Sequence, residues 1–121
     1  MTARVQNGGL ANIVAALVTA SVTKFLQWGT GSAAAATANV VTAAAAEART
    51  SGSMTAQTTT VTNDTLQVVG TIVCATTGKT ISEVGVMDAA SAGNMDFYYD
   101  FTGIALLVGD SIAFTAQVKF V

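Results

Sequence analysis

The last eleven residues of the chain alternate between apolar and more polar side chains. Successive side chains of a β-strand point to opposite faces of the sheet. The alternation therefore predicts a strand over residues 111–121 with one buried face. That face would carry Ile112, Phe114, Ala116, Val118 and Phe120, and the other face would carry Ala113, Thr115, Gln117 and Lys119.

Five further segments have the β-branched and aromatic composition of strands, and turn signals separate them. In the aromatic segment we expect Phe97 and Tyr99 on one face and Tyr98 on the other. Gly70 is expected to mark a β-bulge. Strands at this spacing are typical of an all-β fold, an antiparallel β-sandwich or jelly roll. The five segments are residues 23–28, 55–62, 66–76, 81–87 and 94–101, the third of which contains Gly70.

Two segments leave the secondary structure open. The apolar residues of segment 12–23 are spaced for one face of a short helix, which we favour, whereas their β-branching suits a strand. The alanine-rich segment 33–49 suits either a short helix or a low-complexity loop that becomes ordered against a neighbour. We divide the chain into an N-terminal arm with an apolar segment, residues 1–22, and a β-sandwich domain, residues 23–121.

Charge is scarce in this chain. Charged residues make up 10% of it and apolar residues 51%, whereas a soluble domain has about 25% charged residues. Surfaces of this kind are usually covered by neighbouring subunits in an assembly. The five basic residues are scattered along the sequence, so we expect no nucleic-acid partner. The apolar stretch 10–22 is shorter than the roughly 20 residues of a membrane span, so we expect no membrane partner.

The residues that most often carry enzyme chemistry are missing. The chain has no His and one Cys, which excludes histidine acid–base catalysis, a His/Cys metal site and an internal disulfide. Cys74 lies in an apolar run and is expected to be an inert buried thiol. Asp88, Asp96 and Asp100 lack the spacing of a calcium loop and are expected to be solvated charges. We therefore predict no catalytic residue, no cofactor, no metal and no small-molecule substrate.

Six short stretches in a fixed order resemble a group of small tailed-bacteriophage virion proteins of the capsid cement, or decoration, type. Together they extend over about 90 residues, and their order and spacing carry the resemblance more than any single stretch. They are residues 25–31 (FLQWGTG), 47–49 (EAR), 67–72 (QVVGTI), 81–88 (ISEVGVMD), 93–94 (GN) and 109–115 (GDSIAFT).

The resemblance implies a β-sandwich or jelly-roll subunit on the exterior of the capsid that bridges major capsid proteins and stabilises the shell. The partners expected from it are the major capsid protein and further copies of this chain, as a homodimer or homotrimer. The alternative is a tail or fibre attachment subunit, with Tyr98 and Tyr99 as candidate contacts. A third class is a secreted bacterial fibre or surface-layer subunit exported by residues 1–22.

The contact elements expected for the cement function are the N-terminal arm and the alanine-rich segment. Extended arms add strands to neighbouring sheet edges, and small side chains allow backbones to approach closely. Trp28 fits a core anchor and an interface anchor equally well. Glu47 and Arg49 are expected to form structural ion pairs. The predicted interface residues are Arg4, Val5, Leu10, Trp28, Ala44 and Arg49.

Overall fold

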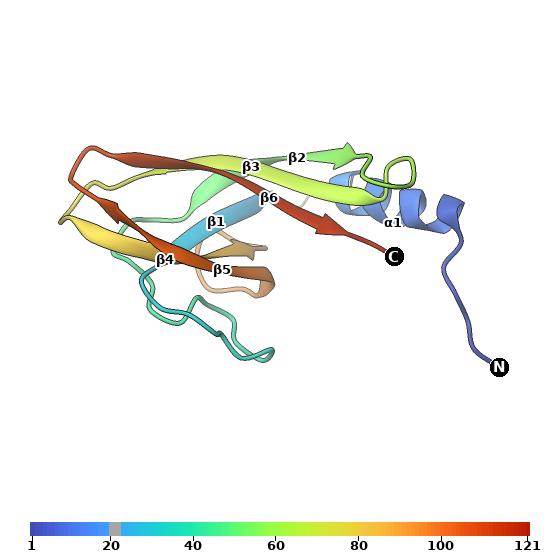
Figure 1. Cartoon of the computed structure of the whole chain (residues 1–121), viewed down its shortest axis with the longest axis horizontal. Helices are drawn as coiled ribbons and strands as arrows, with labels where there is room; N and C mark the ends of the chain where they lie inside the picture. The colour runs from blue at the N-terminus through green and yellow to red at the C-terminus, as the bar shows by residue number, and fades with distance from the viewer. Residues whose placement is uncertain (20–22) are drawn as a thin grey trace.

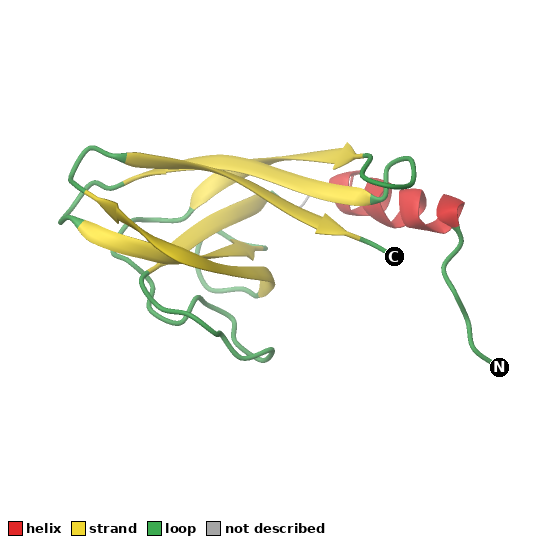
Figure 2. Cartoon of the chain, viewed as in Figure 1, coloured by secondary structure: helices red, strands yellow, loops and turns green. Residues whose placement is uncertain are grey.

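The computed structural model describes residues 1–19 and 23–121 of the chain. This part of the chain contains one helix and six strands (Figures 1 and 2). In chain order they are α1 (Asn7–Thr19), β1 (Lys24–Gly29), β2 (Thr50–Gln57), β3 (Thr65–Val73), β4 (Lys79–Met87), β5 (Met95–Leu106) and β6 (Ser111–Lys119).

The six strands form one antiparallel sheet in the order β5-β4-β1-β2-β3-β6. β2 joins the two halves of the sheet, because its first residues pair with β1 and its later residues pair with β3. The sheet curls strongly, so that its two end strands, β5 and β6, approach each other. Tyr99 of β5 donates a hydrogen bond across this opening to the Gln117 carbonyl of β6, at 2.9 Å. The result is a nearly closed barrel (Figure 1).

The predicted all-β antiparallel class is confirmed. Residues 111–119 form β6 as expected, with Phe114 and Ala116 buried on the predicted inner face. The aromatic strand is longer than predicted, because it continues to Leu106. A jelly roll requires eight strands, and the described residues contain six.

Two local predictions are wrong. The threonine-rich segment 58–62 is not part of a strand; β2 ends at Gln57, and the chain then turns around the carboxylate of Asp64. Gly70 does not mark a bulge, because β3 pairs with β6 in unbroken register from Thr65 to Val73. A Cβ atom at Gly70 would lie 2.8 Å from Leu26 Cδ1, so the glycine allows close packing inside the barrel.

The N-terminal segment is helical over its described residues, and residues 20–22 lie outside them. Helix α1 begins earlier than predicted, at Asn7, and lies at one end of the sheet (Figure 2). Leu10 and Val14, four residues apart on one face, are buried, and Leu17 packs against the same core. This spacing places one apolar stripe against the barrel. No helix among residues 1–19 and 23–121 is long and apolar enough to cross a membrane.

The alanine-rich segment between β1 and β2 forms a loop, the second of the two predicted alternatives. It covers the outer side of β4, since a Cβ atom at Gly85 would lie 3.1 Å from the Val41 side chain. Val41 is 1% exposed, and its amide donates to the side chain of Gln27 at 3.4 Å. β4 is therefore covered on both faces, by the barrel core on one side and by this loop on the other.

Candidate interaction site between the sheet edges

The fully buried carboxylate of Glu83, on β4, holds the alanine-rich loop in place. It accepts hydrogen bonds from the amides of Gly31, Thr42 and Ala43 at 3.1, 3.0 and 2.7 Å. The Tyr98 hydroxyl donates a fourth, at 2.8 Å. Burial alone would raise the pKa of Glu83, but these donors lower it below its ordinary value. The carboxylate is therefore an ionised structural anchor.

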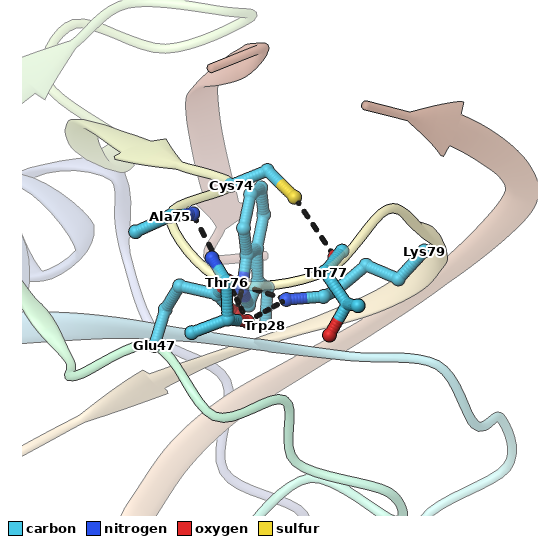
Figure 3. Close-up of polar contacts among 7 residues, drawn as sticks. All are labelled: Trp28, Glu47, Cys74, Ala75, Thr76, Thr77 and Lys79. Atoms are coloured by element: carbon cyan, nitrogen blue, oxygen red, sulfur yellow. Dashed lines mark hydrogen bonds and ion pairs between the residues drawn. The ribbon is translucent and has the colours of Figure 1, made fainter. Parts of the chain in front are cut away.

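A second buried carboxylate, Glu47, connects three parts of the chain (Figure 3). It accepts from the Trp28 indole at 3.1 Å and from the amides of Ala75 and Thr76 at 3.2 and 3.4 Å. The Thr76 hydroxyl and the Lys79 ammonium also donate to it. Burial would raise the pKa of Glu47, but the Lys79 ammonium and the other donors lower it to about 2. The predicted structural ion pair is confirmed for Glu47, with Lys79 as its partner.

Asp64, like Glu83, is a fully buried acid. It accepts from the amides of Thr59, Thr60 and Val61 at 2.9, 3.1 and 2.9 Å, and the Thr59 and Thr65 hydroxyls donate to it as well. Burial would raise the pKa of Asp64, but these donors hold it well below its usual range. Local bonding of this kind competes with strand pairing, and it explains why the threonine-rich segment forms a turn.

The four remaining carboxylates also serve the fold. Asp96 and Asp100 are exposed, as expected for solvated charges, and Asp88 is half-buried. Each also accepts a hydrogen bond within the chain: Asp88 from the Asn94 amide at 2.7 Å, Asp96 from the Lys24 ammonium at 2.6 Å and Asp100 from the Ala33 amide at 3.2 Å. Asp110 accepts from the Leu107 amide at 2.8 Å. All seven carboxylates of the chain thus accept structural hydrogen bonds. Among the described residues no three metal-ligating side chains are grouped to hold a metal ion.

An open groove of about 540 Å³ lies between the two end strands of the sheet. Phe101 of β5 and Phe114 of β6 meet in it, with ring centroids 6.2 Å apart. Asp100 is the one charged side chain of its lining. The groove is therefore an apolar channel bordered by two strand edges. It is lined by Val84, Tyr99, Asp100, Phe101, Thr102, Ile104, Ile112, Ala113, Phe114, Thr115 and Ala116.

The β5–β6 turn next to this groove presents apolar side chains to solvent. Leu107 and Val108 in the turn are 73% and 59% exposed, and Ile104 of β5 is 44% exposed. Val73, which pairs with Ser111 beside the turn, is 49% exposed. These four side chains are here called the apolar tip, and one of them, Ile104, also lines the groove. The groove and the apolar tip together form the candidate interaction site.

The predicted interface residues are not gathered in one place. Arg4 and Val5 are exposed on the N-terminal arm and line a hollow of about 300 Å³ beside the C-terminus. Ala44 is exposed on the alanine-rich loop and forms an isolated bridge with Gly29. Leu10 and Trp28 are 5% and 1% exposed, so both belong to the core of the chain.

The last predicted interface residue, Arg49, has a structural role. Its guanidinium donates to the carbonyls of Ala89 and Ala92 at 2.8 and 2.7 Å and fixes the turn between β4 and β5. It forms no ion pair with the described acids, so the predicted bridge is wrong for this residue. Cys74 is buried, as expected, and its thiol donates to the Thr77 carbonyl at 3.3 Å.

The sequence reasoning missed two features of the site. Glu83 is the one charged residue in the predicted strand 81–87, and that charge was the available signal for a buried anchor. The groove had no local signal, because Phe101 and Phe114 face each other only when the sheet curls.

No family model, curated protein or solved structure matches this chain.

Proposed function

We propose that this chain is a bacteriophage capsid cement protein, which binds the outer surface of the assembled shell and bridges major capsid proteins. The observation that carries the proposal is the apolar tip, where Leu107 is 73% exposed. Exposed apolar groups of this kind mark surfaces that a partner covers. The resemblance of six short sequence stretches to cement proteins supplies the class of partner.

The use of the carboxylates supports a structural role over an enzymatic one. General acid–base catalysis needs a titratable group within reach of a substrate. Glu47, Asp64 and Glu83 are buried and hydrogen-bonded, with pKa values lowered from their ordinary range. The chain has no histidine to take their place.

The proposed mechanism is mass action. A subunit that binds the assembled shell and not its dissociated parts stabilises the shell by its own binding free energy. At a free concentration one hundred times the dissociation constant, each site contributes about 2.7 kcal/mol. Many symmetry-related copies acting together then raise the temperature at which the shell comes apart.

The test is co-sedimentation with empty shells assembled from the major capsid protein of the same phage. We expect saturable binding and a higher shell disruption temperature. Leu107→Asp should weaken binding by about tenfold or more, because it places a charge in the covered surface. Thr55→Asp, on an exposed position of β2, is the matched control. Absence of binding to shells would contradict the proposal, and binding to isolated tails would favour the alternative.

The tail or fibre alternative has no comparable observation in its favour. Its candidate contacts were Tyr98 and Tyr99, and both hydroxyls are already engaged within the chain. Tyr98 donates to Glu83 at 2.8 Å and Tyr99 to the Gln117 carbonyl at 2.9 Å.

A further inference from the structure

β5 and β6 follow each other in the chain, yet they are not paired with each other. They are the two ends of the sheet, joined by residues 107–110. Among the described residues no strand pairs with the outer edge of either one. Unpaired edges of this length are templates for a further strand. The unpaired edges of β5 and β6 therefore present backbone donors and acceptors to a further strand, and apolar side chains line the opening between them.

β5 is distorted where it borders the groove. Its pairing with β4 passes from Glu83↔Asp100 to Ile81↔Ile104, so three residues of β5 stand opposite the single residue Ser82. A bulge bends its strand and ends regular pairing locally. Two of these three residues, Phe101 and Thr102, line the groove.

The N-terminal arm, residues 1–6, has the sequence and exposure of an unpaired strand. All six residues are exposed and precede helix α1 without regular structure of their own. The arm extends away from the barrel in Figure 1. Ala3 and Val5 alternate with Thr2 and Arg4, which is the pattern of a strand with one apolar face. Fully extended, six residues reach about 20 Å, the length of about six residues of a strand edge.

The charges of the arm and the groove are complementary. Arg4 is the one charged side chain of the arm, and residues 7–121 hold four basic and seven acidic side chains, a net charge of −3. Asp100 is the one charged residue among those that line the groove, and its exposed carboxylate lies on the outer face of the edge strand β5. Tyr99 and Phe101 point toward β6, whereas Asp100 reaches the Ala33 amide on the outer face. An arm that places Arg4 opposite Asp100 therefore turns Val5 toward the aromatic rings of the groove.

We propose that the arm of one copy binds as an antiparallel strand along the β5 edge of a second copy, with Arg4 opposite Asp100. This register places Thr2 opposite Thr102. Reciprocal exchange of the arms about a two-fold axis closes a dimer, and exchange around a three-fold axis closes a trimer. The proposal does not depend on capsid binding, because it concerns contacts between copies of this chain.

Cysteine cross-linking between two different full-length variants tests the register. Thr2→Cys is mixed with Thr102→Cys under mild oxidation, and the products are weighed by mass spectrometry. We expect a mixed covalent dimer, because directly opposed residues of an antiparallel pair lie within disulfide range. Thr2→Cys mixed with Thr55→Cys is the control and should give none. Cys74 is buried and present in all variants.

Charge reversal tests the same contact without cross-linking. By sedimentation equilibrium, Arg4→Asp and Asp100→Arg should each weaken self-association by about tenfold, and the double variant should recover most of it. A wild-type protein that stays monomeric, a mixture that gives no Thr2–Thr102 cross-link, or a double variant without recovery would each overturn the proposal. Shell binding of each variant is measured separately, so loss of self-association is distinguishable from failure of the cement function.

Discussion

Replacing Glu83 by alanine removes the acceptor of four hydrogen bonds from the outer side of β4. The donors are the amides of Gly31, Thr42 and Ala43 at 2.7 to 3.1 Å and the Tyr98 hydroxyl at 2.8 Å. Hydrogen bonds to a charged group contribute about 1.5–3 kcal/mol each. The substitution also relieves the cost of burying a carboxylate, and water can reach the exposed Thr42 amide. Breaking a buried charged cluster costs about 3–5 kcal/mol in total, which is the destabilisation we expect.

Glu83→Gln provides a matched comparison, because glutamine keeps the shape and one acceptor oxygen. That oxygen can serve Gly31 and Ala43, which share Glu83 Oε1. The amide NH₂ would then face Thr42 N–H, a donor against a donor, while the Tyr98 hydroxyl can rotate to accept. One lost hydrogen bond and one contact between two donors predict about 2–3 kcal/mol, less than for Glu83→Ala.

Urea unfolding at pH 7 measures both variants, with hydrogen exchange as the local readout. With an unfolding entropy of about 2.1 cal/mol/K per residue over 121 residues, each kcal/mol of lost unfolding free energy lowers Tm by about 4 °C. Glu83→Ala should thus lower Tm by about 12–20 °C. The amides of Thr42 and Ala43 should lose protection in both variants. A loss of less than 1 kcal/mol for Glu83→Ala with unchanged protection would refute the anchor role.

Three further predictions follow from other parts of the structure. Glu47 has a folded pKa of about 2 against an ordinary value of 4.5, so its contribution to stability is complete above about pH 5 and is lost as pH falls toward 2. Between pH 7 and pH 2 the free energy of unfolding should therefore fall less steeply for Glu47→Gln than for the wild type, as measured by denaturation. Gly29→Ala should destabilise the protein by about 2 kcal/mol or more, because its Cβ would lie 2.6 Å from the Ala43 carbonyl oxygen. Gly8→Ala meets nothing within 4 Å and should stabilise α1 by about 0.5–1 kcal/mol. Equal Tm shifts for the two variants would contradict this contrast. Asp64→Ala should destabilise the protein by about 3 kcal/mol or more and remove amide protection from the turn that follows β2, and unaltered exchange there would argue against the role of this carboxylate.

The strands were predictable because their signal is local. The alternation that ends at Phe120 records directly which face of β6 is buried. The helix was harder, because Val14, Leu17 and Val18 satisfy helical spacing while two of the three are β-branched. Packing decided the outcome: Val14 is fully buried and Leu17 and Val18 contact the same core, which only helical spacing allows.

The conformations of the two loops were not predictable from apolar periodicity, because carboxylate side chains determine them. The alanine-rich segment has high helix propensity, yet Glu83, about 40 residues away, accepts two of its amides. Those amides are no longer free to form a helix, and an acceptor at this distance lies outside any local window. The threonine-rich segment has high strand propensity, but Asp64, four residues after Thr60, binds its backbone. This acceptor is local, but the strand propensities of the threonines do not include it.

The candidate site was only partly predictable for a related reason. Composition predicted a chain whose surface is covered by neighbours, but not which surface. Trp28 was an attractive contact from its type alone, yet its indole donates to Glu47 inside the barrel and its ring packs edge-on against Phe114. The groove instead uses residues that looked like ordinary core positions. They become accessible because the sheet does not close between β5 and β6.

The scarcity of charge and the open barrel have a common consequence. In most domains carboxylates are solvated and keep molecules apart, but here the two glutamates and Asp64 are buried as anchors for loops. Three of the seven carboxylates are thus withdrawn from the surface. The β5–β6 end presents an apolar tip and an open strand edge, with Asp100 and Asp110 as its exposed acids. Burial of the apolar tip favours contact with another chain without fixing the orientation of that chain. Backbone hydrogen bonds along the open strand edge then select one strand register.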